Sequence, residues 1–304
     1  MLDNPNSAGE ISPDIALRDF PKLFFATMPR SGTWYSFFLF EFLDMALTGS
    51  TRVRQINEAR IHLGTKIVKC HGHSIYPNFE QIYKGPYRSA WDDLNFYCNA
   101  FNSGHNVVEQ APEQFSPLQS DDLKIIYLYR NPLDQMVSAF HHNKGSLSEQ
   151  HRTYLEPKSG ERVPFSSVSE YLRQGGLEGY IKQFFSYHET RENPNLMMIK
   201  YENLVAEPCR MFEQMIEFVG FDTELEEHRE AIENALTMAA PDRVRDIERK
   251  LGRALAQDQS DPNGSHLRGG QTGKWKNELS PVDIKFCLNE LSRFDIPAES
   301  FIFE

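Results

Sequence analysis

A turn of sequence PRSGT at residues 29–33 carries side chains that can bind an oxyanion. It follows an apolar run, residues 23–28, and precedes an apolar segment of helical length that starts at Trp34. The N-terminus of a helix offers unpaired backbone N–H groups and a partial positive charge. Glycine lets the backbone approach a ligand, the hydroxyls can donate hydrogen bonds, and Arg30 adds a permanent charge. The pattern indicates a phosphate-type site, and an ordinary strand-to-helix turn is the alternative.

The same turn differs from the Walker A loop of ATPases and kinases. That loop requires GxxxxGK[ST], and the turn has neither the second glycine nor the lysine. We also find no strand-end acid suited to magnesium. A P-loop phosphotransferase therefore remains only as an alternative function, and we expect no metal.

A second candidate site begins at Arg130, directly after the apolar run at residues 123–129. Ligands of parallel α/β sheets bind at the carboxyl ends of the strands. Ser138 follows eight residues later, about two turns into the predicted helix. An arginine and a hydroxyl in these positions can clamp a second phosphate.

A third candidate site is the glycine-rich segment RGGQTGKWKN at residues 268–277. A loop of this composition can fold over a nucleotide and supply both arginine and backbone N–H donors. Three cationic turns, far apart in the sequence, thus share the chemistry of phosphate recognition.

These three segments, in this order, resemble the cytosolic sulfotransferases. That family carries a PKSGTTW or PRSGTTW loop, an RNPxDxxVSxxHH element and a late RKGxxGxWKN element, and its landmarks here span about residues 23–290. The resemblance implies transfer of a sulfuryl group from 3′-phosphoadenosine-5′-phosphosulfate (PAPS) to a hydroxyl or amine, with the bisphosphate PAP as product. It also implies one α/β domain built around a parallel sheet.

The resemblance implies a donor site drawn from all three segments. The residues implied to hold the 5′-phosphosulfate are Arg30, Ser31, Gly32 and Thr33. Those implied to hold the 3′-phosphate are Arg130, Ser138, Arg268, Gly269 and Gly270. Tyr201 is implied to lie near the adenine, on which Trp34 or Tyr35 can stack.

Several residues depart from the family pattern. Arg30 replaces the lysine of many relatives, so its role becomes electrostatic rather than that of a proton donor. Trp34 stands where the loop has a second threonine, and Tyr35 where it has its tryptophan. Gly269 replaces the lysine of the late element. These changes leave a non-catalytic module that only binds PAPS or PAP as an alternative.

The general base is expected in the segment Lys69-Cys70-His71, which resembles the family's K-x-H element and follows an apolar run at residues 65–69. A histidine titrates near neutral pH and suits removal of the acceptor's proton. The resemblance makes His71 the base and Lys69 a cationic stabiliser of the transferred group. The other candidates for the base are His73, His105, Glu109 and His266.

Strands and helices alternate along the chain in a way that predicts an α/β fold with a mainly parallel sheet flanked by helices. The expected strands are 23–28, 65–69, 123–129 and 196–201. The expected helices are 34–47, 133–142, 208–219, a charged stretch at 225–260, and 281–294, which Ser280 caps. We assign one domain, 1–304, with an N-terminal extension at about 1–20. Two excursions, 74–118 and 143–170, are expected to be lids or acceptor-pocket walls, or else plain surface loops.

Composition excludes several classes of partner. The formal net charge of −11 over 304 residues disfavours nonspecific nucleic-acid binding, which needs a basic surface. No apolar run approaches the roughly 20 residues of a membrane span, and the first residues do not resemble a signal peptide. The four cysteines lie far apart, which is typical of reduced thiols in the cytoplasm. We expect a small-molecule or carrier-bound acceptor, and the acidic balance favours a cationic one.

Overall fold

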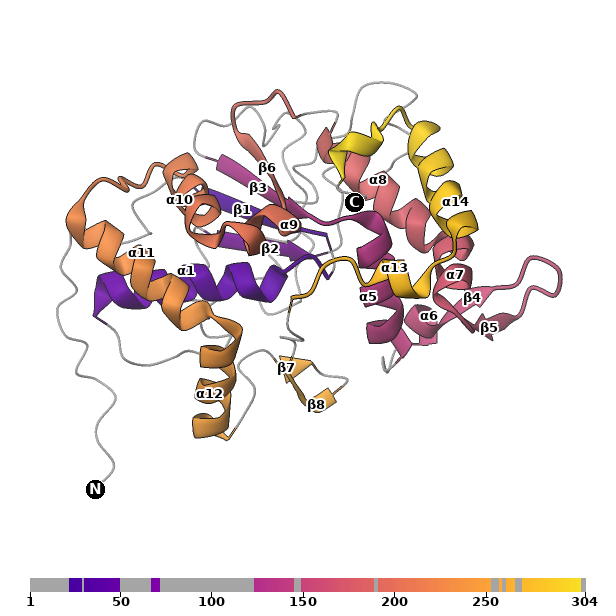
Figure 1. Cartoon of the computed structure of the whole chain (residues 1–304), viewed down its shortest axis with the longest axis horizontal. Helices are drawn as coiled ribbons and strands as arrows, with labels where there is room; N and C mark the ends of the chain where they lie inside the picture. Colours follow the sequence, from indigo (N-terminus) through magenta and orange to yellow (C-terminus); the bar gives the residue numbers. More distant parts are fainter. Residues whose placement is uncertain are drawn as a thin grey trace, which may run out of the picture.

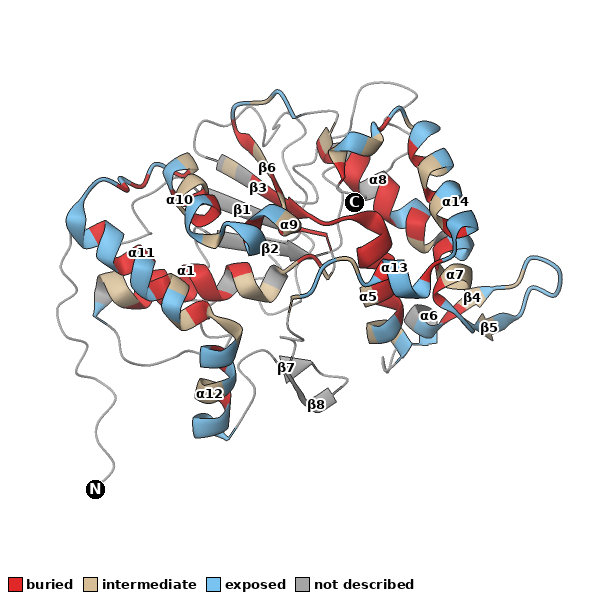
Figure 2. Cartoon of the chain, in the orientation of Figure 1, coloured by how far each residue is buried: buried red, intermediate tan, exposed pale blue. Residues whose placement is uncertain are grey.

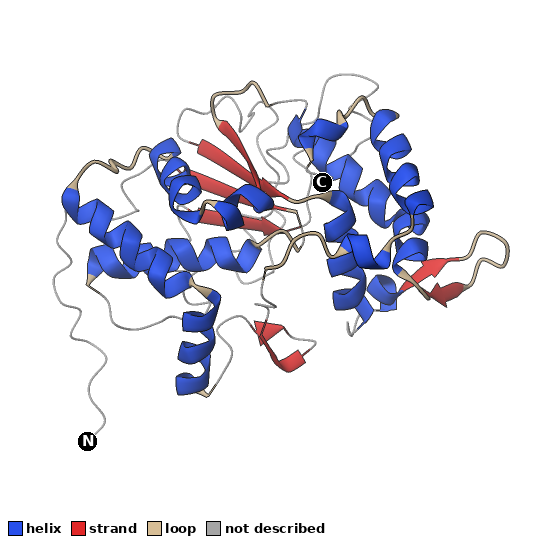
Figure 3. Cartoon of the chain, in the orientation of Figure 1, coloured by secondary structure: helices blue, strands red, loops and turns tan. Residues whose placement is uncertain are grey.

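The computed structural model describes residues 22–28, 30–49, 67–71, 123–144, 149–188, 191–252, 257–258, 261–265 and 270–301. Within these residues a parallel four-stranded sheet has the order β2-β1-β3-β6. Its strands are β1 (Lys22–Thr27), β2 (Ile67–His71), β3 (Leu123–Tyr129) and β6 (Leu196–Lys200). Figure 3 shows the strands side by side between two groups of helices. The expected α/β fold with a parallel sheet is confirmed.

Strand β3 explains why both faces of the sheet are covered. Its residues 126–129 are all buried, but consecutive side chains point to opposite faces. Ile126 and Leu128 join one apolar cluster, whereas Tyr127 and Tyr129 join another. A strand that is apolar on both faces needs helices on both, and Figure 2 shows buried helix surfaces turned toward the sheet from each side.

The helices divide between these two clusters. The Ile126 side is covered by α1 (Thr33–Thr48), α9 (Tyr201–Ala206), α10 (Pro208–Phe218), α11 (Glu226–Ala239) and α12 (Pro241–Leu251). The Tyr127 side is covered by α5 (Pro132–Lys144), α7 (Val168–Tyr171), one π-helical turn (Leu172–Gly176), α8 (Leu177–His188), α13 (Trp275–Glu278) and α14 (Pro281–Ser292). Figure 1 shows α1 and α11 together on one side and α5, α8 and α14 on the other.

The remaining elements are short. Helix α6 (Glu149–Arg152) leads into an antiparallel hairpin of β4 (Thr153–Leu155) and β5 (Arg162–Pro164), which projects from the body of the protein in Figure 1. A second hairpin pairs β7 (Gln257–Asp258) with β8 (Asp261–Ser265), and a 3-10 turn (Ala298–Ser300) follows α14. None of the described helices is long and apolar enough to cross a bilayer.

Most expected elements are confirmed to within two residues at each end, and four differences from the sequence-based expectation affect the interpretation of the chain. Strand β2 spans 67–71, not 65–69, so the Lys69-Cys70-His71 segment forms part of the strand and does not follow it. Strand β6 ends at Lys200, and Tyr201 begins α9. The charged stretch expected at 225–260 forms two helices, because Pro241 has no N–H and starts a new one. The last helix ends at Ser292, not at 294, and Ser280 caps it as expected.

Candidate active site

The turn between β1 and α1 is held by two backbone hydrogen bonds. Met28 N donates to Leu128 O over 2.8 Å, which continues the pairing of β1 with β3, and Ser31 N donates to Met28 O over 3.1 Å. Arg30 and Gly32 both adopt the left-handed backbone region, with φ of 65° and 85°. Gly32 is also the N-cap of α1 and has no side chain with which to pair the first-turn N–H groups.

The Ser31 hydroxyl is buried in this turn without a hydrogen-bond partner among the described residues. A buried hydroxyl left in this state is destabilising by about 1–3 kcal/mol. It lies beside the N-terminal turn of α1, whose first N–H groups have no acceptor within the helix. The Ser31 hydroxyl and the first N–H groups of α1 are therefore donors that suit an oxyanion.

Arg130 joins this turn to the late glycine-rich loop. Its Nη1 donates to Arg30 O over 3.2 Å, and its Nη2 donates to Gln271 O over 2.7 Å. The residue is only 6% exposed, and its own carbonyl accepts a hydrogen bond from the Tyr180 hydroxyl. Nε of Arg130 has no hydrogen-bond partner in the described part of the chain. Segments about 100 and 140 residues away in the sequence thus meet at one guanidinium.

Two carboxylates lie close to Arg130. Asp134 Oδ2 is 3.8 Å from Nη2, and Glu202 Oε1 is 4.0 Å from Nε. Burial raises the pKa of Glu202, and the hydrogen bond that its carboxylate accepts from Asn131 N, 3.0 Å long, opposes this shift. The buried guanidinium is therefore compensated by acids, as a buried charge must be.

Asp134 also anchors the late loop. Its carboxylate accepts hydrogen bonds from Gly273 N at 2.6 Å and from Trp275 N at 3.3 Å. On the same side of the site, His141 Nε2 and Glu278 Oε2 lie 2.6 Å apart and join α5 to α13. These contacts fix the late loop against the start of α5.

Tyr201 touches all three candidate segments. Its ring packs against Gly32, its face lies 4.8 Å from the Arg130 guanidinium carbon, and its hydroxyl donates to Gly270 O over 3.1 Å. Gly270 has φ of 63°, and a Cβ there would lie 2.8 Å from the Tyr201 oxygen. Burial raises the pKa of Tyr201, so the hydroxyl stays protonated and can donate.

Other predicted residues take clear positions around this cluster. Ser138 Oγ accepts a hydrogen bond of 3.4 Å from Arg30 Nε, so the first and second motifs meet a second time. Trp34 and Tyr35 are half-buried against the cluster on the α1 side of the sheet. Burial also raises the pKa of Tyr35. Thr33 is the first residue of α1.

Strand pairing places the expected base at the same edge of the sheet. His71 is the last residue of β2 and is paired with Thr27, the last residue of β1. Lys69, two residues earlier in β2, is paired with Phe25. Arg268, Gly269 and the other candidates for the base, His73, His105, Glu109 and His266, lie outside the described residues.

The two carboxylates and the tyrosine that hold Arg130 in place were not predicted from the sequence. The available signals were the position of Asp134 in the RNPLD segment and that of Glu202 directly after Tyr201. Tyr180 gave no signal, because it belongs to an amphipathic helix pattern.

In the part of the chain that the structure describes, no group of three or more His, Cys, Asp or Glu residues could hold a metal ion.

Comparison with known proteins gives consistent matches. The family model described as "sulfotransferase domain" matches residues 20–289. Cytosolic sulfotransferase 17 of Arabidopsis thaliana is 23% identical over 250 residues, which cover 77% of this chain and 67% of that protein. A mouse sulfotransferase solved in complex with PAP has a TM-score of 0.52 at 16% identity, over 93% of this chain and 88% of that one. Retinol dehydratase, solved with androsterone and PAP, has a TM-score of 0.53 at 16% identity, over 92% and 81% of the two chains.

Proposed function

The chain belongs to the sulfotransferase domain family, a family of enzymes, and we propose that it moves a sulfuryl group from PAPS to a hydroxyl or amine. The proposed acceptor is a small molecule or a carrier-bound metabolite. Two solved proteins that share the fold are in complex with PAP, and one of them is in complex with androsterone as well. We propose a cytoplasmic location, in keeping with the relative that is named a cytosolic enzyme.

The observation that carries this proposal is the meeting of three distant segments around Tyr201 and Arg130. Tyr201 contacts Gly32 in the first segment and Gly270 in the third, and Arg130 in the second lies on the face of its ring. PAPS carries phosphate at two separated positions of one adenosine. A donor of this shape needs two anion-binding sites on either side of one adenosine-binding site. Three converging segments with phosphate-binding chemistry are suited to form such a site.

In the proposed donor site the 5′-phosphosulfate lies at the turn that starts α1. It is held by Arg30, by the backbone N–H groups of residues 32–33 and by the Ser31 hydroxyl. This hydroxyl has no hydrogen-bond partner among the described residues, so it can donate to the ligand. The aromatic rings of Trp34 or Tyr35, with Tyr201 nearby, accommodate the adenine.

The 3′-phosphate is assigned to Arg130, Ser138 and the segment 268–270. The Nε–H of Arg130 has no hydrogen-bond partner among the described residues, but Asp134 and Glu202 offset the charge of the guanidinium. The additional positive charge for this phosphate is therefore assigned to Arg268, while Arg30 is assigned to the 5′-phosphosulfate. The Arg30–Ser138 hydrogen bond is long at 3.4 Å, so both groups can turn toward an oxyanion.

We propose that the transfer is an in-line displacement. The acceptor oxygen or nitrogen forms its bond to sulfur while the bond from sulfur to the 5′-phosphate oxygen breaks, and PAP leaves. His71 takes the acceptor's proton, and Lys69 and Arg30 stabilise the charge on the transferred group and the leaving phosphate. The pairing of His71 with Thr27 supports this role, because it places the histidine beside the end of β1.

Transfer of ³⁵S from labelled PAPS to a panel of phenols, alcohols and amines tests the function. Label must move to at least one acceptor, and the wild type must be retained on immobilised 3′,5′-ADP. Retention without any transfer would favour the non-catalytic binding module. Magnesium-dependent ATP turnover without retention would favour a P-loop phosphotransferase.

A further inference from the structure

A cavity of about 400 Å³ lies between the C-terminal half of α5, helix α6, the β4–β5 hairpin and α7. This volume falls within the range of sites that hold small molecules. The residues around it have no part in the donor site described above.

The cavity opens on the side of α5 that faces away from the donor site. Ser138 marks the donor side, because its Oγ accepts from Arg30. Successive residues of an α-helix are turned by about 100°. Phe140, Asn143 and Lys144, which line the cavity, therefore lie between about 140° and 240° around α5 from Ser138. A molecule in this cavity does not compete with the donor for space.

One wall of the cavity is aromatic. Phe140 is 8% exposed, and its ring centroid lies 6.3 Å from that of Tyr171. The ring of Phe165 meets Tyr171 edge-on, with centroids 5.0 Å apart, and is itself stacked on Tyr154 at 5.2 Å. Rings that are fixed by their neighbours form a preorganised surface for a planar ligand.

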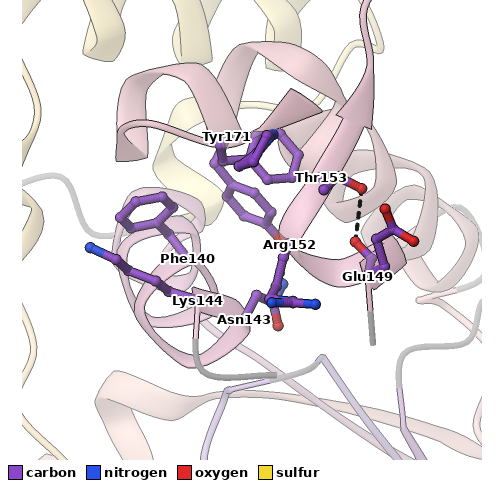
Figure 4. A pocket seen from close by; sticks show the side chains of 9 residues that line it. Phe140, Asn143, Lys144, Glu149, Arg152, Thr153 and Tyr171 are labelled. Atoms are coloured by element: carbon purple, nitrogen blue, oxygen red, sulfur yellow. Dashed lines mark hydrogen bonds between the residues drawn. The ribbon is translucent and has the colours of Figure 1, made fainter. Parts of the chain in front are cut away.

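The rim of the cavity is polar and carries more positive than negative charge. Lys144 and Arg152 line it, and within the described residues neither has a carboxylate within 4.0 Å. Asn143 Nδ2 donates to the Tyr171 hydroxyl over 3.3 Å. Glu149 is the one acid among the described lining residues. Figure 4 shows Lys144 and Glu149 reaching out on opposite sides, with Arg152, Asn143 and Tyr171 between them.

We propose that this cavity is a second ligand site, which binds a planar aromatic molecule carrying a carboxylate or sulfate group. The ring lies against Phe140, Phe165 and Tyr171. The anionic group lies beside Arg152 and Lys144, two exposed cations without a carboxylate partner among the described residues, on a protein whose net charge is −11. The polar rim orients the ligand, and the aromatic wall supplies the apolar contact.

Calorimetric titration with 2-naphthoate and its neutral isostere 2-naphthamide tests this proposal, both with and without PAP. We expect the naphthoate to bind about tenfold more tightly than the amide, whether or not PAP is present. In the double variant Lys144→Gln/Arg152→Gln the naphthoate should lose about tenfold in affinity, since each exposed ion pair is worth up to about fivefold. Both side chains are exposed, so folding should be unaffected. Arg210→Gln, on the distant helix α10, is the matched control and should bind as the wild type does.

A separate variant tests the aromatic wall. Phe165→Leu should weaken the naphthoate and the naphthamide to a similar extent, because both lose the same ring contact. Three outcomes would each overturn the proposal. They are equal affinity for the two ligands, an unchanged dissociation constant in the double variant, and no binding of the naphthoate. Loss of naphthoate binding on addition of PAP would place the ligand in the transfer site instead. The titration without PAP keeps this test independent of the proposed enzymatic function.

Discussion

Tyr201 packs so closely on Gly32 that a Cβ atom on the glycine would lie 2.5 Å from two carbons of the tyrosine ring. The contact joins the turn before α1 to the start of α9, although the two residues are far apart in the sequence. Since the same ring also lies on Arg130 and bonds to Gly270 O, the three segments of the donor site share one packing centre.

The Gly32 contact predicts a large effect for Gly32→Ala. Alanine at φ of 85° is strained by about 1–2 kcal/mol, and the Tyr201 ring must move as well. We expect a loss of about 2–4 kcal/mol in the free energy of unfolding in urea, together with weaker PAP binding. Gly179→Ala on α8 is the control, because nothing lies within 4 Å of a Cβ there. This control should gain about 0.5–1 kcal/mol. Wild-type stability in Gly32→Ala would disprove the contact.

Asp134 is predicted to act as a positioning residue. In Asp134→Asn only one oxygen remains to accept from Gly273 N and Trp275 N, so the late loop loses an anchor. We expect the KM for PAPS to rise about tenfold, the effect of one lost charge-assisted hydrogen bond, while kcat at saturating PAPS changes less than about threefold. Asp246→Asn, at a partly exposed acid on α12, should leave both constants unchanged. A fall in kcat alone would assign Asp134 a different role.

Asp283 predicts a pH-dependent stability. Burial raises the pKa of this carboxyl, but hydrogen bonds from Ser169, Ser280 and Arg173 outweigh that effect and hold the pKa below its usual range. A lowered pKa means that the carboxylate stabilises the fold above its unfolded pKa, near 4, and that this contribution is lost as the pH falls below it.

The corresponding measurement is urea unfolding of wild type and Asp283→Asn between pH 7 and pH 3.5. At pH 7 the variant should be less stable by about 1–2 kcal/mol, because the capping box of α14 is broken. The difference should be constant above about pH 5 and shrink below about pH 4. A difference that does not change with pH would show that the Asp283 charge is unimportant.

His71→Ala tests the assignment of the base. Removing a general base should lower turnover by about 10²-fold or more while PAP binding stays intact. A fully active variant would transfer the role to one of the other candidates, His73, His105, Glu109 or His266. His188→Ala, on α8, is the control and should retain activity.

Local sequence signals predicted the elements that depend on local interactions. Strand β3 was predicted at residues 123–129 as observed, because an apolar run followed by Arg130-Asn131-Pro132 has sharp limits. Ser280 was predicted as an N-cap because serine before proline is typical of a helix start. Strand β2 was placed two residues too early, since its end is set by pairing with β1 rather than by its own composition.

The donor-site residues were predicted by type, but their connections were not. The Asp134–Gly273 hydrogen bond joins residues 139 apart, and Glu202 bonds to the backbone of Asn131 over a separation of 71. Such partners are chosen by the tertiary fold, and no local pattern distinguishes them from surface acids. Likewise, the aromatic cavity beside α5 depends on a hairpin within a stretch that reads as a polar excursion.

In the proposed donor site one cluster of residues holds both phosphates of a doubly phosphorylated adenosine, and comparative titration with PAP, 5′-AMP and ATP measures whether it does. PAP should bind at least about tenfold more tightly than either of the others, because only PAP carries the 3′-phosphate. Arg268→Ala and Ser138→Ala should reduce that preference without lowering the stability of the free protein. Equal affinity for PAP and AMP, or tighter binding of ATP, would show that the site does not recognise a 3′-phosphate.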